Sequence, residues 1–140
     1  MPPRLSVVVP CFNEAATISQ TITTIHQYLD RQNISHEIIV ADDGSRDGTA
    51  ERATRTFPSA EWLQVIKLQH GGKGRAVKKG AFRSRGDLVL MCDADLATPM
   101  DELPAFLEAV GEGADVVIAS RDLPKSVLVV PQLLHRRLVG

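Results

Sequence analysis

The chain has 140 residues, of which 44% are hydrophobic and 24% charged, and this balance fits one globular domain spanning residues 1–140. A formal net charge of −1 and 4% aromatic residues provide neither a basic field nor many base-stacking platforms, which argues against nucleic acid as a partner. The two cysteines, Cys11 and Cys92, are too few for a disulfide framework or a four-ligand zinc site. We expect both to be buried free thiols in a reducing compartment.

The first half of the chain alternates strand and helix patterns. Residues 5–10 form a β-branched apolar run that predicts a buried strand. This run is too short for a signal peptide, and no segment reaches the roughly 20 apolar residues of a membrane-spanning helix. We therefore expect a cytoplasmic protein. Apolar side chains then recur at helical spacing at Ile18, Ile22, Ile25 and Leu29. A second strand is predicted over residues 38–41, and a short helix over residues 49–57, which Pro58 ends.

The second half continues the alternation. A third strand is predicted over residues 62–68, and a glycine-rich loop and a helical segment follow it. Residues 88–91 are expected to form a strand buried on both faces. A fourth helix carries Leu103, Phe106, Leu107 and Val110, and Asp101 is its expected N-cap because Pro104 is then tolerated in the first turn. A fifth strand over residues 116–120 is expected to end at Arg121.

This alternation predicts an α/β fold, with a doubly wound, mainly parallel sheet and helices on both faces. Ligands of such sheets bind beyond the carboxyl ends of the strands. Every predicted carboxyl end is polar: Asn13 and Glu14, Asp42 and Asp43, the loop 71–74, Asp93 and Asp95, and Arg121. The sequence therefore predicts a polar site at this edge.

Asp93 and Asp95 are the candidate metal ligands. Carboxylate oxygens suit Mg²⁺ or Mn²⁺, whose coordination substrate phosphates usually complete, although two aspartates at a strand end can also be turn or cap residues. Lys73 within the glycine loop could contact phosphate, but the spacing is not that of a P-loop and a plain turn remains the alternative. No Gly-x-Gly-x-x-Gly follows the first strand, which argues against a dinucleotide cofactor.

Two further candidates have equally simple alternatives. Asp42 and Asp43 stand beside Gly44 and Ser45, as turn residues do, but a carboxylate there could also accept a base N–H from a nucleotide. Arg121 is either a surface charge or a bidentate phosphate contact.

Five motifs, in this order and spacing, resemble the GT-A domain of glycosyltransferase family 2, in particular its polyprenyl-phosphate hexosyltransferase group, which contains dolichyl-phosphate mannose synthases and glucosyltransferases. They are Pro10-Cys11-Phe12-Asn13-Glu14, the segment 40–49 with Asp42-Asp43-Gly44-Ser45, Gly72-Lys73-Gly74, Asp93-Ala94-Asp95 and Ala119-Ser120-Arg121. The resemblance covers nearly the whole chain.

The resemblance implies an inverting transfer of a hexose from a nucleotide diphosphate sugar to a polyprenyl phosphate at the cytosolic face of a membrane. It implies that the nucleotide is bound by Pro10, Phe12, Glu14, Asp42, Asp43, Lys73 and Asp93, and the metal by Asp95 with Asp93. Arg121 with Arg136 or Arg137 would meet the acceptor phosphate, and Asp93, Asp95 and Arg121 would form the catalytic set.

Two departures from the family pattern refine these expectations. Mannose-type members usually have Gln where this chain has Ala97, which favours UDP-glucose as the donor, with GDP-mannose next. Family domains also continue beyond this length, so the apolar segment 127–139 with Arg136 and Arg137 is either the start of a membrane-contacting segment or an apolar end that promotes self-association.

Three alternatives remain open at this point. The chain could transfer to a saccharide, which would require a carboxylate base such as Asp122, or it could bind nucleotide sugars without turnover. A phospho-receiver domain ranks last, because receivers place their acceptor Asp on the third strand, and in this chain that strand ends in Gln69 and His70.

Overall fold

The computed structural model describes residues 1–119. The chain divides into two compact units, Met1–Asp101 and Glu102–Gly140, and the sheet lies in the first. Among the predicted site residues, Arg121, Arg136 and Arg137 lie outside the described residues, as does the segment 127–139. None of the described helices has the length and apolar character needed to cross a membrane.

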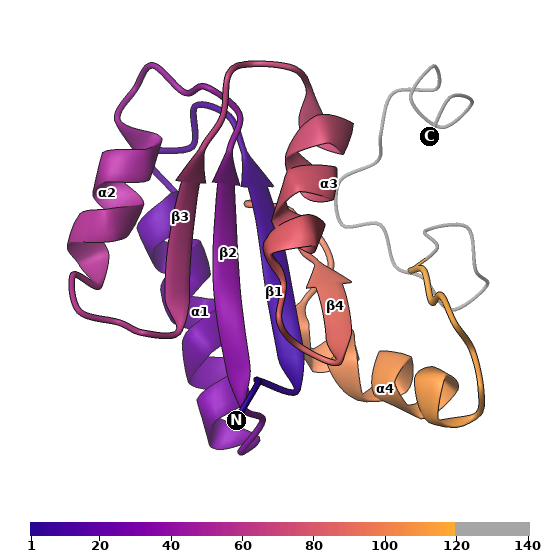
Figure 1. Cartoon of the computed structure of the whole chain (residues 1–140). Coiled ribbons are helices and arrows are strands. Elements are labelled where there is room, and N and C mark those ends of the chain that lie inside the picture. The colour runs from indigo at the N-terminus through magenta and orange to yellow at the C-terminus, as the bar shows by residue number, and fades with distance from the viewer. Residues whose placement is uncertain (120–140) are drawn as a thin grey trace. The chain divides into compact units, whose positions relative to one another are not determined.

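The first unit is a parallel four-stranded sheet in the order β3-β2-β1-β4 (Figure 1). Its elements in chain order are β1 (Leu5–Cys11), α1 (Ile18–Arg31), β2 (His36–Asp42), α2 (Thr49–Thr56), β3 (Leu63–Lys67), α3 (Lys73–Arg83) and β4 (Leu88–Met91). Helix α3 lies on one face of the sheet, and α1 lies on the other with α2 beside it (Figure 1). The doubly wound α/β fold predicted from the sequence is therefore confirmed.

The core forms around the two central strands. Every residue of β1 is buried, and Val7, Val8, Val9, Ile38, Ile39 and Val40 have no exposed surface. The four apolar positions of α1 that the sequence spacing indicated, Ile18, Ile22, Ile25 and Leu29, are also fully buried. Burying a side chain of this size stabilises the fold by about 1.5–3 kcal/mol relative to leaving it exposed.

Strand β4 differs from the expectation of burial on both faces. Val89 is 50% exposed and Met91 46% exposed. The physical reason is that β4 is an edge strand paired only with β1, while α3 packs mainly on β1 and β2. An apolar run alone therefore did not distinguish an edge strand from a central one.

In the second unit, α4 spans Leu103–Gly111 after a 3₁₀ turn at Met100–Glu102. Glu102 occupies the N-cap position instead of Asp101, but Pro104 does lie in the first turn, where no helix hydrogen bond is lost. The expected fifth strand is wrong for the described residues 116–119, which are irregular, with Val116 and Ile118 each 81% exposed. A β-prone segment becomes a strand only by pairing, and within the described part of the chain these residues have no strand partner.

Candidate functional site

The strand order reverses between β1 and β4, because the chain adds β2 and β3 on one side of β1 and then returns to its other side. A pocket of about 290 Å³ lies beyond the carboxyl ends of the strands there, in the position where doubly wound folds bind ligands. Its wall contains seven of the residues expected from the sequence: Pro10, Phe12, Glu14, Asp43, Lys73, Asp93 and Asp95. Cys11, Ala76 and Ala94 complete the wall.

Asp93 and Lys73 form an ion pair in the wall of this pocket. Lys73 is the first residue of α3, and its Nζ lies 2.5 Å from Oδ1 of Asp93. Both side chains are partly exposed, at 58% and 36%. The ion pair is therefore open to a ligand that competes for either charge.

Asp95 lies in a tight turn after β4. Its Oδ1 accepts the N–H of Ala97 at 3.0 Å, and between them Leu96 has a left-handed φ of +51°. Such a backbone is strained for a leucine, and strain of this kind gathers at binding sites. The buried Thr21 hydroxyl of α1 donates to the carbonyl of Ala94 at 2.5 Å, and this hydrogen bond ties the turn to α1.

Asp43 ties the glycine loop to the end of β2. Its two carboxylate oxygens accept the N–H groups of Gly71 and Gly72, each at 2.9 Å, and His70 Nδ1 lies 2.9 Å from Oδ2. Burial acts to raise the pKa of Asp43, but the two backbone donors and His70 outweigh it and hold the pKa below its usual value. Gly44 allows this approach, because a Cβ there would lie 2.9 Å from the backbone nitrogen of His70.

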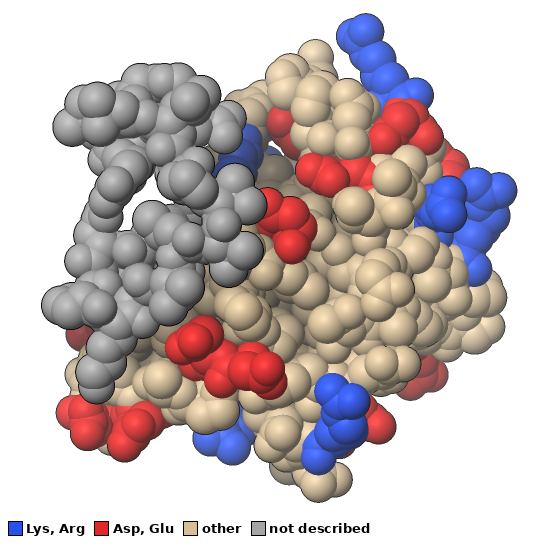
Figure 2. Space-filling model, turned by 180° about the vertical axis from the view of Figure 1, so that it is seen from behind, with Lys and Arg blue, Asp and Glu red and all other residues tan. Residues whose placement is uncertain are grey.

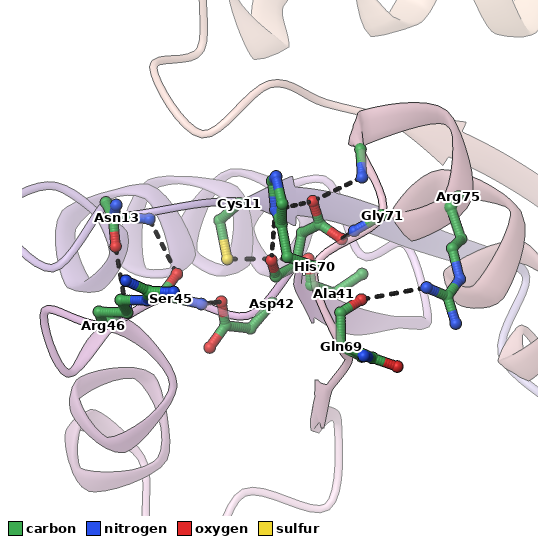
Figure 3. A network of polar contacts seen from close by, with 12 residues as sticks. Cys11, Asn13, Ala41, Asp42, Ser45, Arg46, Gln69, His70, Gly71 and Arg75 are labelled. Atoms are coloured by element: carbon green, nitrogen blue, oxygen red, sulfur yellow. Dashed lines mark hydrogen bonds and ion pairs between the residues drawn. The ribbon is translucent and has the colours of Figure 1, made fainter.

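Asp42 is buried but is not part of the pocket wall. Its Oδ1 accepts the N–H of Ser45 at 3.0 Å, as turn residues do. Ser45 in turn accepts the N–H of Asn13, and the Asn13 side chain accepts the N–H of Arg46 (Figure 3). These bonds join the loops that follow β1 and β2.

Asp47 makes a second connection between the same loops. Its carboxylate accepts the N–H of Ala15 at 3.0 Å and both the N–H and the hydroxyl of Thr49. The Thr49 hydroxyl also accepts the N–H of Glu14 at 2.9 Å. The hydrogen bond from the Thr49 hydroxyl, followed by that from Ala15, holds the pKa of Asp47 below its usual value, so this connection stays ionised near neutral pH.

His70, Thr21 and Asp47 were not among the candidate site residues from the sequence. The His70 ring packs at a tilt against the half-exposed Phe12 ring, with centroids 4.5 Å apart, and so supports the one aromatic residue of the pocket wall. For Thr21 the available signal was its position next to the apolar face of α1. A hydroxyl buried there needs a hydrogen-bond partner, which indicates a contact with another element. For His70 the signal was its place directly before the glycine loop.

The two cysteines are buried free thiols, as expected. Burial is the main cause that raises the pKa of each to about 12, and neighbouring carboxylates, Asp42 for Cys11 and Asp93 for Cys92, add to it. Neither thiol has the thiolate character of a nucleophile at neutral pH.

Two carboxylates of the pocket fit a divalent cation. Asp93 and Asp95 line the same wall and provide hard oxygen donors, which suit Mg²⁺ or Mn²⁺ when ligand phosphates supply the other oxygens. Within residues 1–119, no group of three or more His, Cys, Asp or Glu side chains is arranged to hold a metal. A cation here would depend on the ligand for much of its coordination.

Figure 2, seen from the side opposite that of Figure 1, shows acidic side chains at both ends of the molecule, with basic side chains next to those at the end toward which the strands point. The suitability of the pocket for a cation therefore rests on Asp93 and Asp95 in its wall.

The chain matches the model of glycosyl transferase family 2 over residues 6–137, and it belongs to this family. The solved structures that it resembles are GT-A glycosyltransferases, which agrees with the fold described above.

Two curated relatives act on polyprenyl phosphates, according to their names. An undecaprenyl-phosphate 4-deoxy-4-formamido-L-arabinose transferase from Aeromonas hydrophila subsp. hydrophila is 34% identical over 115 residues, covering 81% of this chain and 35% of the relative. A dolichol-phosphate mannosyltransferase from Pyrococcus furiosus is 31% identical over 118 residues, covering 84% of this chain and 33% of the relative. The chain thus spans about a third of the length of these relatives.

Two solved structures contain nucleotides and Mn²⁺. A mannosyltransferase from Pyrobaculum calidifontis in complex with GDP-Man and Mn²⁺ has a TM-score of 0.62 and 27% identity, covering 75% of this chain and 31% of that one. Glucosyl-3-phosphoglycerate synthase from Mycobacterium tuberculosis, in complex with Mn²⁺, UDP and glucosyl-3-phosphoglycerate, has a TM-score of 0.60 and 29% identity, covering 81% of this chain and 41% of that one.

Proposed function

We propose that this chain binds a nucleotide diphosphate sugar in the pocket between β1 and β4 and forms the donor side of an inverting hexosyltransferase that acts on polyprenyl phosphate at the cytosolic face of a membrane. The observation that carries the proposal is the convergence of Lys73, Asp93 and Asp95 on one pocket at the reversal point of the sheet. The names of the relatives and the nucleotide complexes of the similar structures support it.

Different residues in and next to the pocket are proposed to contact different parts of the donor. The Phe12 ring, against which the tilted His70 ring packs, offers an apolar surface for the base, next to Pro10 and Glu14. The buried Asp42 is the acceptor proposed for a base N–H. Lys73 would then meet the diphosphate, leaving its pair with Asp93. In this arrangement Asp43 acts by holding the loop that presents Lys73.

Asp95, with Asp93, would hold Mg²⁺ or Mn²⁺. The cation supplies neutralisation of the charge that develops on the departing diphosphate. In the transfer, an acceptor phosphate oxygen forms a bond to the anomeric carbon from the opposite side, while the bond from that carbon to the diphosphate oxygen breaks and its electron pair leaves with the nucleoside diphosphate. The acceptor phosphate is already ionised near neutral pH, so positioning contributes more than a strong base.

Two finer parts of the proposal rest on sequence alone. UDP-glucose is the favoured donor because Ala97 replaces the glutamine of mannose-type members, with GDP-mannose second. Arg121, with Arg136 or Arg137, is proposed to contact the acceptor phosphate.

Calorimetric titration tests the donor site. UDP-glucose and GDP-mannose are titrated into the protein with Mn²⁺ and with a chelator, for the wild type and for Asp95→Ala. We expect UDP-glucose to bind more tightly, only with Mn²⁺, and the variant to lose the effect of the metal. Asp87→Ala is the control, because this exposed aspartate lies outside the pocket wall.

Equal affinity with and without chelator would contradict the metal part of the proposal. Asp42→Ala should weaken binding by about 1–3 kcal/mol, the usual cost of leaving a buried donor unpaired, and a change of a few tenths would leave Asp42 as a turn residue only. Metal-dependent binding without transfer to a polyprenyl phosphate would favour a nucleotide-sugar-binding module.

A further inference from the structure

Helix α3 has a fixed inner face. Ala76 and Gly80 are buried, and a Cβ at Gly80 would clash with the side chain of Val8 on β1. The glycine therefore lets the helix pack closely on the sheet. This close contact determines which side chains of α3 point outward.

The outer face of α3 consists of Arg75, Lys78, Lys79 and Phe82, which recur at i, i+3, i+4 and i+7 and are all exposed. Phe82 is 77% exposed, and the Lys78 ammonium lies 5.9 Å from the centre of its ring. One face of the helix thus presents three cationic residues and a protruding aromatic ring, and one of the cations lies over that ring.

The positive charge is concentrated around this helix. Residues 73–85 contain six of the sixteen Lys and Arg residues of the chain and no Asp or Glu, although the net charge of the whole chain is −1. Lys73 and Arg85 are neutralised by Asp93 and Glu37. Among the described residues, Lys78, Lys79 and Arg83 form no ion pair, so their charge faces outward.

We propose that the outer face of α3, formed by Arg75, Lys78, Lys79 and Phe82, is a docking surface for a membrane containing anionic phospholipid. Basic residues near such a surface gain electrostatic attraction, and an exposed ring beside them can enter the headgroup region. Nucleic acid is the weaker choice, because a single aromatic side chain offers little base stacking and the chain as a whole carries no positive field.

The inference deepens the proposed function, which places the chain at a membrane, by naming the surface that contacts the lipid; in this respect it rests on that proposal. The first turn of α3 lines the pocket with Lys73 and Ala76, and the outer face begins in that turn at Arg75 and continues along the next two turns. Docking through this face would bring the pocket to the membrane surface. A lipid-linked acceptor could then reach the site without leaving the bilayer.

Co-sedimentation of the full chain with lipid vesicles tests the proposal. The vesicles contain phosphatidylcholine alone or phosphatidylcholine mixed with phosphatidylglycerol, and neither contains nucleotide or polyprenyl phosphate. We expect binding only to the anionic vesicles, weakened by salt. Lys78→Glu with Lys79→Glu should reduce binding by about tenfold or more, and Phe82→Ala by about threefold.

The matched control is Arg52→Glu with Arg55→Glu, the same charge change on exposed positions of α2. It should leave most of the binding intact, and thermal unfolding should show that all variants are folded. Equal loss in both double variants would overturn the proposal, as would binding that disappears only in Arg136→Glu with Arg137→Glu. Tighter binding to a single-stranded oligonucleotide, with the same dependence on Lys78 and Lys79, would overturn it in favour of nucleic acid.

Because the vesicles lack donor and acceptor, their result is separate from the titration that tests the nucleotide site. The α3 double variant should also bind UDP-glucose as the wild type does, since neither lysine lines the pocket. A loss of nucleotide binding in that variant would show instead that the outer face belongs to the donor site.

Discussion

The two ends of the sheet use buried carboxylates in similar ways but with different consequences. At the amino end, Glu37 accepts the Ser6 hydroxyl at 2.6 Å and the backbone and side-chain N–H groups of Arg85 at 2.6–2.9 Å. At the carboxyl end, Asp43 accepts two backbone N–H groups in the same manner. Both carboxylates have pKa values below their usual range, despite the opposing effect of burial.

What differs is the surroundings of each carboxylate. Glu37 closes a structural joint between β1, β2 and the segment before β4. Asp43 holds a loop whose next residues carry Lys73 into a pocket with two further aspartates. Left-handed backbone also gathers at the carboxyl end, at Asn13, Gly44, Gly48, Gly72 and Leu96. A buried carboxylate therefore does not by itself indicate function, whereas one that positions other charges around a pocket does.

The largest expected effect separates the two ends by stability. Glu37→Ala removes the acceptor of a buried network and should lower the free energy of unfolding by about 3 kcal/mol, because partners of a buried charge are left unsatisfied. Urea unfolding measures this. Glu61→Ala, at an exposed position, is the matched control and should change stability by less than about 0.5 kcal/mol. If Glu37→Ala instead weakened nucleotide binding at unchanged stability, the comparison would fail.

Asp43→Ala should affect stability and binding together. Loss of the acceptor for Gly71 and Gly72 should cost about 2 kcal/mol of unfolding free energy and should also weaken nucleotide binding, since the loop that carries Lys73 is released. Urea unfolding and calorimetry on the same variant measure both. Asp43→Asn keeps the size but can accept only one of the two N–H groups and presents its own NH2 group to the other, so it should restore neither property in full. Unchanged nucleotide affinity would mean that Asp43, like Glu37, has a structural role only.

Thr21→Val sharpens the comparison at the site itself. The hydroxyl of Thr21 positions the carbonyl between Asp93 and Asp95, so its loss should weaken metal-dependent nucleotide binding by about 1 kcal/mol. Thr21→Ser should restore the affinity. Thr23→Val is the control, because the Thr23 hydroxyl bonds to the backbone of α1 at Ser19. Equal effects of the two valine variants would show a general loss of helix stability.

The parts of the fold that depend on local pattern were predictable from the sequence. The spacing of Ile18, Ile22, Ile25 and Leu29 fixed the buried face of α1, and the polar ends of parallel strands predicted a shared edge. Exposure of Val89 and Met91 was not predictable, because it depends on β4 being the edge strand, and strand order comes from the whole topology. The strand predicted over residues 116–120 was wrong for the described residues 116–119 for the same reason, because a β-prone segment does not by itself specify a pairing partner.

The site shows the same division. Seven residues named from strand-end position and motif line one pocket, because the fold brings all strand ends together. Thr21 and His70 were missed, because each acts through a contact with residues distant in sequence, Ala94 and Phe12. Such contacts follow from packing, and a single sequence does not specify them.

The smallest expected effect concerns pH and a histidine cluster away from the pocket. The His26 ring stacks on Trp62 with centroids 3.8 Å apart, and His26 Nδ1 lies 2.9 Å from His36 Nε2. His36 Nδ1 faces the carbonyl of Ile34 at 2.8 Å and so carries a proton, which assigns the proton of the pair to His26 Nδ1 when both rings are neutral. Burial, and then the neighbouring His36, lower the pKa of His26, while Asp30 opposes them.

A histidine whose pKa is lower in the folded state than in the unfolded state binds more protons on unfolding. Its contribution to stability is therefore present above about pH 6.5 and is lost as the pH falls toward the folded pKa. The pKa values of Glu37 and Asp43 are lowered from 4.5 and 3.8, so their contributions disappear only in more acid solution. Between about pH 7 and pH 5 the free energy of unfolding of the wild type should decrease. In His26→Phe, which keeps the ring stack, this decrease should be smaller by up to about 1 kcal/mol. Urea unfolding across this range measures the difference, and parallel curves would mean that His26 is not the acid-sensitive group.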